Sequence, residues 1–161
     1  MTDVLQNSRG WPHIGNLSRF TLYPGATNEQ ITAAQERIGY KLPLDYRDFL
    51  RVTNGSGFEG FLFFPIDRSN RSAGAGVAVL HDLTRDPETW PVCAVGTMDL
   101  GSDERIGFLK SDLATSKTPC PVYVFWHEEG NYDLLADSFR TLIDELIALP
   151  PGNEYVPLWM R

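Results

Sequence analysis

The stretch between Ile38 and Gly55 constrains the fold most, because it contains the end of one helix and the whole of a second. Gly39 can adopt the left-handed conformation that ends a helix without a Cβ penalty. Pro43 suits the first turn of the next helix, where no backbone N–H is needed, and Asn54 tolerates the positive φ of a helix end. Residues expected on one buried face recur at three- and four-residue steps: Tyr46, Phe49, Leu50 and Thr53. The stretch predicts a helical hairpin with a bulky face that packs on the rest of the domain.

Capping signals place the helices. Thr27 and Gln30 form a capping box, which predicts a first helix over about 28–38 and leaves about 44–53 for the second. Asp137 or Ser138 caps a last helix that stops at the Pro150-Pro151 pair. Its apolar stripe consists of Phe139, Leu142, Ile143, Leu146, Ile147 and Leu149.

Strand signals fill the middle of the chain. An aromatic run over 58–64 has high β preference, and shorter runs over 92–96, 105–109 and 122–126 read as further strands. Residues 77–80 fit either a short strand or a helical turn, and residues 127–133 form a polar turn. This order predicts an α+β single domain, with a mostly antiparallel sheet flanked by the N-terminal helical hairpin and the C-terminal helix. Residues 1–25 form an N-terminal arm and 26–161 the domain, with Tyr155, Leu158 and Trp159 folding back onto it.

Composition bounds the class of protein. Of 161 residues, 42% are hydrophobic and 22% charged, as in soluble globular proteins. No apolar run approaches the roughly 20 residues that span a bilayer, and no signal peptide is recognisable, so we expect a cytoplasmic protein that does not bind membranes. Cys93 and Cys120 lie in apolar surroundings and are predicted to be buried free thiols.

The formal net charge of −7 is unevenly distributed. Residues 86–161 hold 13 acidic and 5 basic residues, a net −8, whereas residues 1–85 carry a net +1. Such a field repels nucleic acid and attracts a basic partner. A solvated acidic surface that serves only solubility is the alternative.

Residues that could carry chemistry are scattered. His81-Asp82 and His127-Glu128-Glu129 lack the helical spacing of a zinc protease, and the acidic turn at 99–104 lacks the ordered ligands of a calcium loop. We therefore expect no catalysis, no metal and no cofactor. A small-ligand binder that uses His81 or His127 remains the alternative from the residues alone.

Three segments together resemble the SUKH superfamily, which includes fungal cell-wall-synthesis regulators and many bacterial immunity proteins. The first is the helical hairpin, with Ile38-Gly39, Leu42-Pro43, Asp45-Tyr46, Phe49-Leu50 and Asn54-Gly55. The second is Gly60 with the aromatic strand after it. The third runs from Val122-Tyr123 through Trp126-His127-Glu128 to Ala136-Asp137-Ser138-Phe139 and the last helix.

The resemblance implies an α+β fold, and for the bacterial branch an immunity protein that neutralises a cognate toxin domain, often a nuclease or deaminase. A regulatory scaffold of the cell-wall type is the other function that it implies. An acidic protein suits blocking a basic toxin by protein–protein contact, and we expect a monomer or weak dimer. The predicted contact surface consists of Asp99, Asp103, Glu104, Trp126, Glu128, Glu129, Tyr132 and Asp133, with Trp126 as its anchor.

Overall fold

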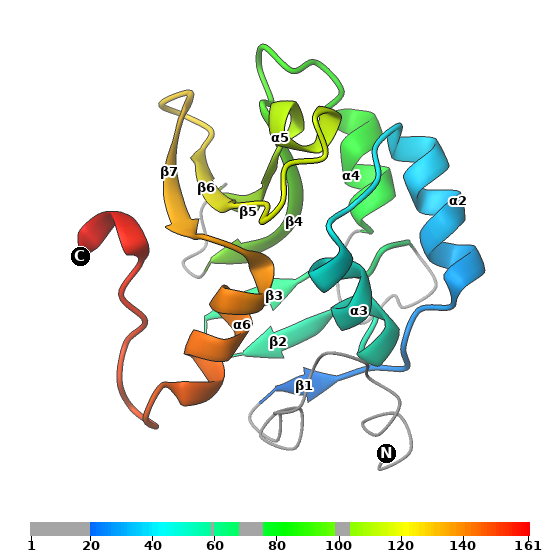
Figure 1. Ribbon diagram of the computed structural model, residues 1–161. Coiled ribbons are helices and arrows are strands. Elements are labelled where there is room, and N and C mark those ends of the chain that lie inside the picture. The colour runs from blue at the N-terminus through cyan, green and yellow to red at the C-terminus, as the bar shows by residue number, and fades with distance from the viewer. Residues whose placement is uncertain (1–19, 59, 68–75, 99–103) are drawn as a thin grey trace.

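The computed structural model describes residues 20–58, 60–67, 76–98 and 104–161. Within them seven strands form one sheet, in which each strand is antiparallel to its neighbours and the spatial order follows the chain (Figure 1). The fold is therefore α+β, as predicted. The strands are β1 (Thr21–Leu22), β2 (Ser56–Phe58), β3 (Phe61–Phe63), β4 (Val92–Met98), β5 (Arg105–Leu109), β6 (Val122–Trp126) and β7 (Asn131–Ala136).

The three helices predicted from the sequence begin at their predicted signals. Thr27 accepts from the Gln30 amide while Gln30 accepts from the Thr27 amide, and Gly39 ends the first helix at φ 86°. Pro43 precedes the second helix, and the Ser138 side chain caps the last long helix by accepting from the Thr141 amide. The helices are α2 (Asn28–Ile38), α3 (Leu44–Val52), α4 (Val77–Leu83), α5 (Lys110–Ala114), α6 (Phe139–Ala148) and the 3-10 turn η3 (Leu158–Met160).

The main core lies on one face of the sheet, which we call the inner face. Helices α3 and α6 lie side by side over it (Figure 1). The fully buried Phe139 of α6 lies at the centre, with its ring centroid 4.9 Å from that of Tyr46, 5.1 Å from that of Phe49 and 5.7 Å from that of Phe63. The aromatic face predicted for the second helix therefore packs on the last helix and the sheet together.

A second, smaller cluster lies on the opposite face, which we call the outer face. It contains Val92, Leu109 and Phe125, with Trp90 and Tyr123 packed against it. Side chains alternate along a strand, so Val124 of β6 belongs to the main core while Phe125 belongs to the second cluster. The sheet is thus covered on both faces, mainly by helices on one and by single aromatic side chains on the other.

Two local predictions need correction, and one alternative is decided. The aromatic run over 58–64 forms the hairpin β2–β3 instead of one strand, with Gly60 at φ 91° beside the reversal. Of the two alternatives for residues 77–80, the helical one is confirmed, because these residues begin helix α4. The polar turn after β6 ends at Gly130, because β7 starts at Asn131 and pairs with β6. β7 was not predicted because its first residues are polar. Such residues are tolerated there because β7 is an edge strand of the described sheet.

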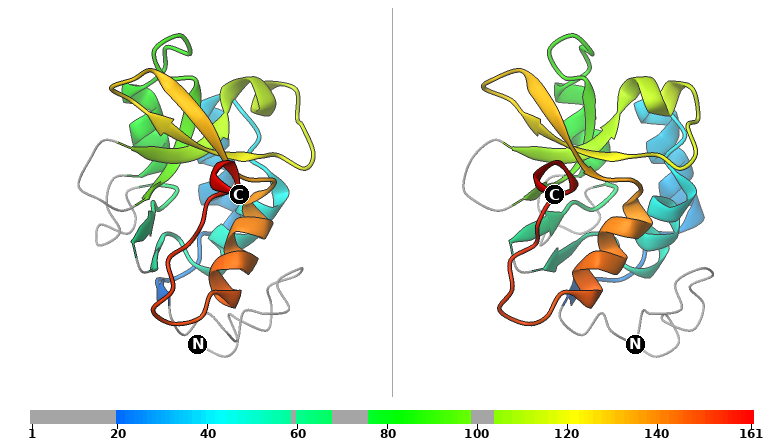
Figure 2. Two further views of the ribbon diagram at one scale, coloured as in Figure 1. Left: turned by 90° about the vertical axis from the view of Figure 1, so that its left-hand side faces the viewer. Right: turned by 60° about the vertical axis from the view of Figure 1, so that its left-hand side comes forward.

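The segment after α6 folds back, as predicted (Figure 2). The Tyr155 hydroxyl donates to Glu145 Oε2 over 2.9 Å and to the Leu135 carbonyl over 3.3 Å, and the Trp159 ring meets the Trp126 ring edge-on at 6.0 Å. Cys93 and Cys120 are buried free thiols. None of the helices in the described ranges has the length and apolarity needed to cross a bilayer. Residues 1–19 of the predicted arm lie outside the described residues; Thr21 and Leu22 belong to the sheet through β1.

Candidate protein-binding surface

The turn between β6 and β7 presents two exposed members of the predicted surface. Glu128 and Glu129 are both exposed, and the turn is closed by the Glu129 and Gly130 amides, which donate to the Trp126 carbonyl over 3.2 and 2.8 Å. Gly130 adopts φ 72°, a conformation that glycine adopts without strain. The backbone of this turn is therefore held by its own hydrogen bonds, and both carboxylates face solvent.

The sheet separates the remaining predicted residues. Tyr132 pairs with Phe125 across the strands and lies on the outer face, with 44% of its surface exposed. Asp133 pairs with Val124 and lies on the inner face, where its Oδ2 accepts from the Trp126 indole N–H over 2.7 Å. One contact surface on the outer face can include Tyr132 but not the carboxylate of Asp133.

Trp126 is half-buried rather than freely exposed. Its indole N–H is bound to Asp133, and its ring packs on Trp159 of η3. The structure thus gives Trp126 the position of a support beneath the β6–β7 turn. An anchor role for this side chain would require residues 158–160 to leave it.

Trp90 is the outer-face residue that sequence reasoning missed. It lies in the segment before β4, and its ring stacks on the exposed His127 ring at 4.6 Å and packs on Phe125 at 5.1 Å. Tyr123 and Tyr132 meet edge-to-face beside them at 5.4 Å. Pro87 and Pro91 flank Trp90 and could have indicated a tryptophan in a turn. Nothing in the sequence, however, predicts the contact between residues 90 and 127.

The stacking of Trp90 on His127 brings a second acidic turn to the same face. Asp86 and Glu88 are exposed in the turn that positions Trp90, since the Trp90 amide donates to the Asp86 carbonyl over 2.8 Å and the Glu88 amide donates to Asp86 Oδ1 over 3.0 Å. We call the residues gathered here the outer-face patch: Asp86, Glu88, Trp90, Tyr123, His127, Glu128, Glu129 and Tyr132.

The remaining members of the predicted surface come from the acidic turn at 99–104. Asp99 and Asp103 lie outside the described residues. Glu104 is half-buried, and its Oε2 atom is buried without a hydrogen-bond partner among the described residues. Arg105 lies next to Phe125 on the outer face and donates to the Glu104 carbonyl, so one cation borders the patch.

Three titratable groups away from the patch are buried: His81, Lys110 and Cys93. His81 on α4 is buried, and its pKa is lowered by burial and by the charges of Lys110 and Arg85. The buried Lys110 ammonium donates to the Thr84 carbonyl, and burial lowers its pKa. Burial raises the pKa of the Cys93 thiol to about 12. His81 and His127 belong to different parts of the molecule, and no group of three metal-ligating side chains occurs in the described ranges.

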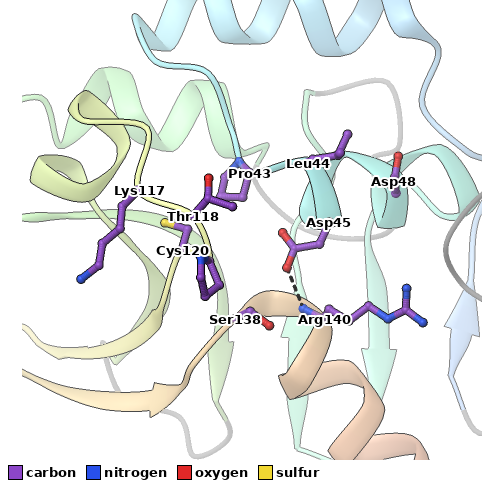
Figure 3. A pocket seen from close by; sticks show the side chains of 10 residues that line it. Pro43, Leu44, Asp45, Asp48, Lys117, Thr118, Cys120, Ser138 and Arg140 are labelled. Carbon is purple, nitrogen blue, oxygen red and sulfur yellow. Dashed lines mark hydrogen bonds between the residues drawn. The ribbon is translucent and has the colours of Figure 1, made fainter.

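A pocket of about 320 Å³ opens where the N-termini of α3 and α6 converge (Figure 3). Asp45 holds this junction together: its Oδ2 accepts from the Arg140 amide of α6 over 2.9 Å, and its Oδ1 accepts from the Tyr46 amide over 2.8 Å. The carboxylate therefore satisfies an orphan N–H of one helix from the first turn of another. The Asp45-Tyr46 pair of the hairpin motif has a structural role.

The rest of the motif is structural as well. Leu42, Tyr46, Phe49 and Leu50 are buried, and the buried Asn54 accepts from the Ile66 amide over 2.7 Å. These hairpin residues define the fold, and none of them belongs to the outer-face patch.

Comparison with known proteins agrees with this assignment. No curated protein sequence matches the chain. The model of the SMI1/KNR4 family (SUKH-1) matches residues 25–145. This range begins two residues before the α2 capping box, ends within α6, and includes the whole hairpin motif and both strands that flank the β6–β7 turn. Because this match spans well over half of the chain, the protein belongs to the SMI1/KNR4 family (SUKH-1).

Proposed function

We propose that this protein is an immunity protein that binds and neutralises a cognate bacterial toxin domain by protein–protein contact. The observation that supports the proposal is the outer-face patch, in which aromatic side chains are bordered by four exposed carboxylates from two turns. Interfaces gain most of their binding free energy from a few aromatic anchors surrounded by polar residues. The patch has this composition, and it contains none of the residues of the helical hairpin.

The charge of the patch indicates the class of toxin. Asp86, Glu88, Glu128 and Glu129 carry four negative charges, whereas Arg105 borders the patch and the buried Lys110 interacts electrostatically with Asp86. Enzymes that process nucleic acids bind phosphates with basic surfaces, so a nuclease or deaminase domain is the complementary partner. Carboxylates placed in its phosphate-binding groove would exclude the substrate and speed association.

Inhibition by occupation needs no chemistry from this chain. We propose that the protein is not an enzyme, and that it acts in the cytoplasm as a monomer or weak dimer, without nucleic acid or membrane as a partner. Tyr132 and Trp90 would be the anchors, with Glu128 and Glu129 at the rim. Trp126 and Asp133 would support the turn from the inner face.

The proposal is tested by capture and rescue. Toxin domains encoded next to this gene are cloned as baits, and the full chain is tested for binding them and for rescuing cells that express them. Tight capture of a basic toxin domain together with rescue is the expected result. Capture of cell-wall-synthesis proteins without rescue by any neighbouring toxin would contradict the proposal and favour the regulatory scaffold.

Charge reversal then tests the surface. The variant E128K/E129K should slow association with the captured toxin sharply at low salt, because it removes the electrostatic attraction of the rim. The matched control is E29K/E36K, which reverses two exposed charges on α2. Equal slowing by both variants would show a general effect of net charge and would remove the outer-face patch from the interface.

A further inference from the structure

The segment that carries Trp90 joins the end of α4 to the start of β4 over residues 84–91, and we call it the Trp90 loop (Figure 1). Residues 85–89 are all exposed, so packing in the core does not hold the middle of the loop. The position of the loop on the protein therefore depends on its two ends and on the Trp90 ring.

Both ends of the Trp90 loop are bound to one residue, Lys110. The Lys110 ammonium donates to the Thr84 carbonyl at the first end. The Lys110 backbone amide donates to the Pro91 carbonyl at the last end over 2.8 Å. Lys110 directly follows β5, where Leu109 pairs with Val92 of β4. This residue thus fixes the span that the loop has to bridge.

The two links make different demands on residue 110. A backbone amide, which every residue except proline has, is enough to bind Pro91, whereas the link to Thr84 needs a long side chain that ends in a donor. Only 3% of Lys110 is exposed, and a buried charge is costly unless it is hydrogen-bonded. The Thr84 amide and hydroxyl are bound to the His81 and Leu80 carbonyls of α4, so the ammonium ties the end of α4 to the sheet.

The charge of Lys110 also acts on the loop. Burial lowers the pKa of Lys110, and the Asp86 carboxylate opposes this shift because it attracts the ammonium. Asp86 organises the rest of the loop, since its carbonyl accepts from the Trp90 amide over 2.8 Å and its Oδ1 accepts from the Glu88 amide over 3.0 Å. The Trp90 ring then stacks on His127 at 4.6 Å. A continuous series of contacts leads from the Lys110 side chain to the Trp90 ring.

We propose that Lys110 is a positioning residue for the outer-face patch: its buried ammonium holds the Trp90 loop at the Thr84 carbonyl and so places the Trp90 ring for a partner. The part that concerns a partner rests on the proposed function, whereas the placement of the loop does not. Lys110 acts from beneath the surface, as a residue outside both the patch and the helical hairpin.

The first test needs no toxin. K110M keeps a long unbranched side chain but removes the donor and the charge, and its indole N–H signals are compared with those of the unaltered chain by nuclear magnetic resonance. The Trp90 signal should shift toward that of an exposed indole, and the His127 ring signals should shift because the stacked ring has moved. The Trp126 and Trp159 signals should stay in place and show that the variant is folded. An unchanged Trp90 signal would overturn the proposal.

A second measurement uses the unaltered chain and so does not depend on the folding of a variant. The ammonium protons of Lys110 should exchange with water more slowly than those of the exposed Lys41 and Lys117, because they are buried and bound to a carbonyl. A lysine-selective spectrum measures the three rates. Exchange at Lys110 as fast as at the exposed lysines would overturn the proposal.

The partner enters through a double-mutant cycle with the captured toxin. W90A and K110M should each weaken binding by about tenfold, and the double variant should bind no more weakly than W90A, because Lys110 acts through Trp90. Fully additive losses would contradict a positioning role. The matched control K117M removes an exposed lysine charge and should bind like the unaltered chain. Failure to capture any toxin would count against the proposed function, and the two spectra would then decide whether Lys110 places the loop.

Discussion

Both faces of the sheet carry aromatic side chains, but the two faces differ in how far their aromatic and acidic side chains are exposed to solvent. On the inner face, Phe139 is buried among other rings, and the nearby Asp45 carboxylate is bound to two backbone amides. On the outer face, Phe125 is buried under Trp90, but Tyr132 remains 44% exposed among carboxylates that face solvent. On the inner face the Asp45 carboxylate is bound within the protein, whereas on the outer face aromatic surface and charge are exposed to solvent.

This comparison predicts that mutations on the inner face change mainly the free energy of unfolding. Mutations on the outer face should change mainly the binding affinity. The hairpin motif lies wholly in the first category. A match to the SMI1/KNR4 family therefore identifies the fold and does not identify a partner.

The largest effect on stability is expected from F139A. Phe139 is fully buried and contacts Tyr46, Phe49, Phe63 and Phe108, and truncation of a buried Phe to Ala costs about 3–5 kcal/mol. Urea unfolding followed by circular dichroism measures the change. F139L, which keeps most of the volume, should lose clearly less. A loss below about 1 kcal/mol for F139A would contradict the central place given to this ring.

Asp45 comes next. D45A removes the acceptor for both the Tyr46 and the Arg140 amides, and the loss of a helix cap costs about 0.5–2 kcal/mol. D45N keeps one acceptor oxygen but loses the charge near two helix N-termini, so it should fall between D45A and the unaltered chain. If D45A and D45N proved as stable as the unaltered chain, the junction of α3 and α6 would not depend on this carboxylate.

A third prediction concerns pH and the buried His81. Because its folded-state pKa is lowered, mainly by burial, the unfolded chain takes up a proton near pH 6.5 while the folded chain stays neutral. The free energy of unfolding should therefore fall as the pH drops below about 6.5, by at most about 1.4 kcal/mol per pH unit from this group. In H81L the decline should be shallower.

The comparison of H81L with the unaltered chain between pH 7.5 and 5 isolates this residue. Asp82 and Glu145 have pKa values lowered by their arginine partners, so their contributions are lost only at more acidic pH. His81 Nδ1 has no hydrogen-bond partner among the described residues, so an apolar replacement loses no hydrogen bond from that atom. If the free energy of unfolding fell equally with pH in both proteins, the fall could not be attributed to His81.

The sequence predicted the inner face better than the outer one, for a physical reason. Caps and apolar periodicity are local signals, and Thr27, Gly39 and Ser138 placed three helix boundaries correctly. The β6–β7 pairing and the contact between residues 90 and 127 depend on tertiary structure. Polar Asn131 and Asp133 concealed β7, because an edge strand needs little apolar alternation, and a surface drawn from sequence neighbours combined residues from both faces.

The smallest effect on stability, and the sharpest contrast between the faces, is expected from Y132A. Tyr132 is nearly half exposed and touches Tyr123 edge-on, so its truncation should change the free energy of unfolding by no more than about 0.5 kcal/mol. Binding to the captured toxin should weaken by about 1–2 kcal/mol or more if the ring is an anchor, measured by surface plasmon resonance. Y132F keeps the ring and should bind nearly as well, which separates ring contact from hydroxyl contact. Unchanged affinity of Y132A would place the interface away from the outer face, since Tyr132 is exposed whereas Trp90 and Tyr123 of the patch are half-buried.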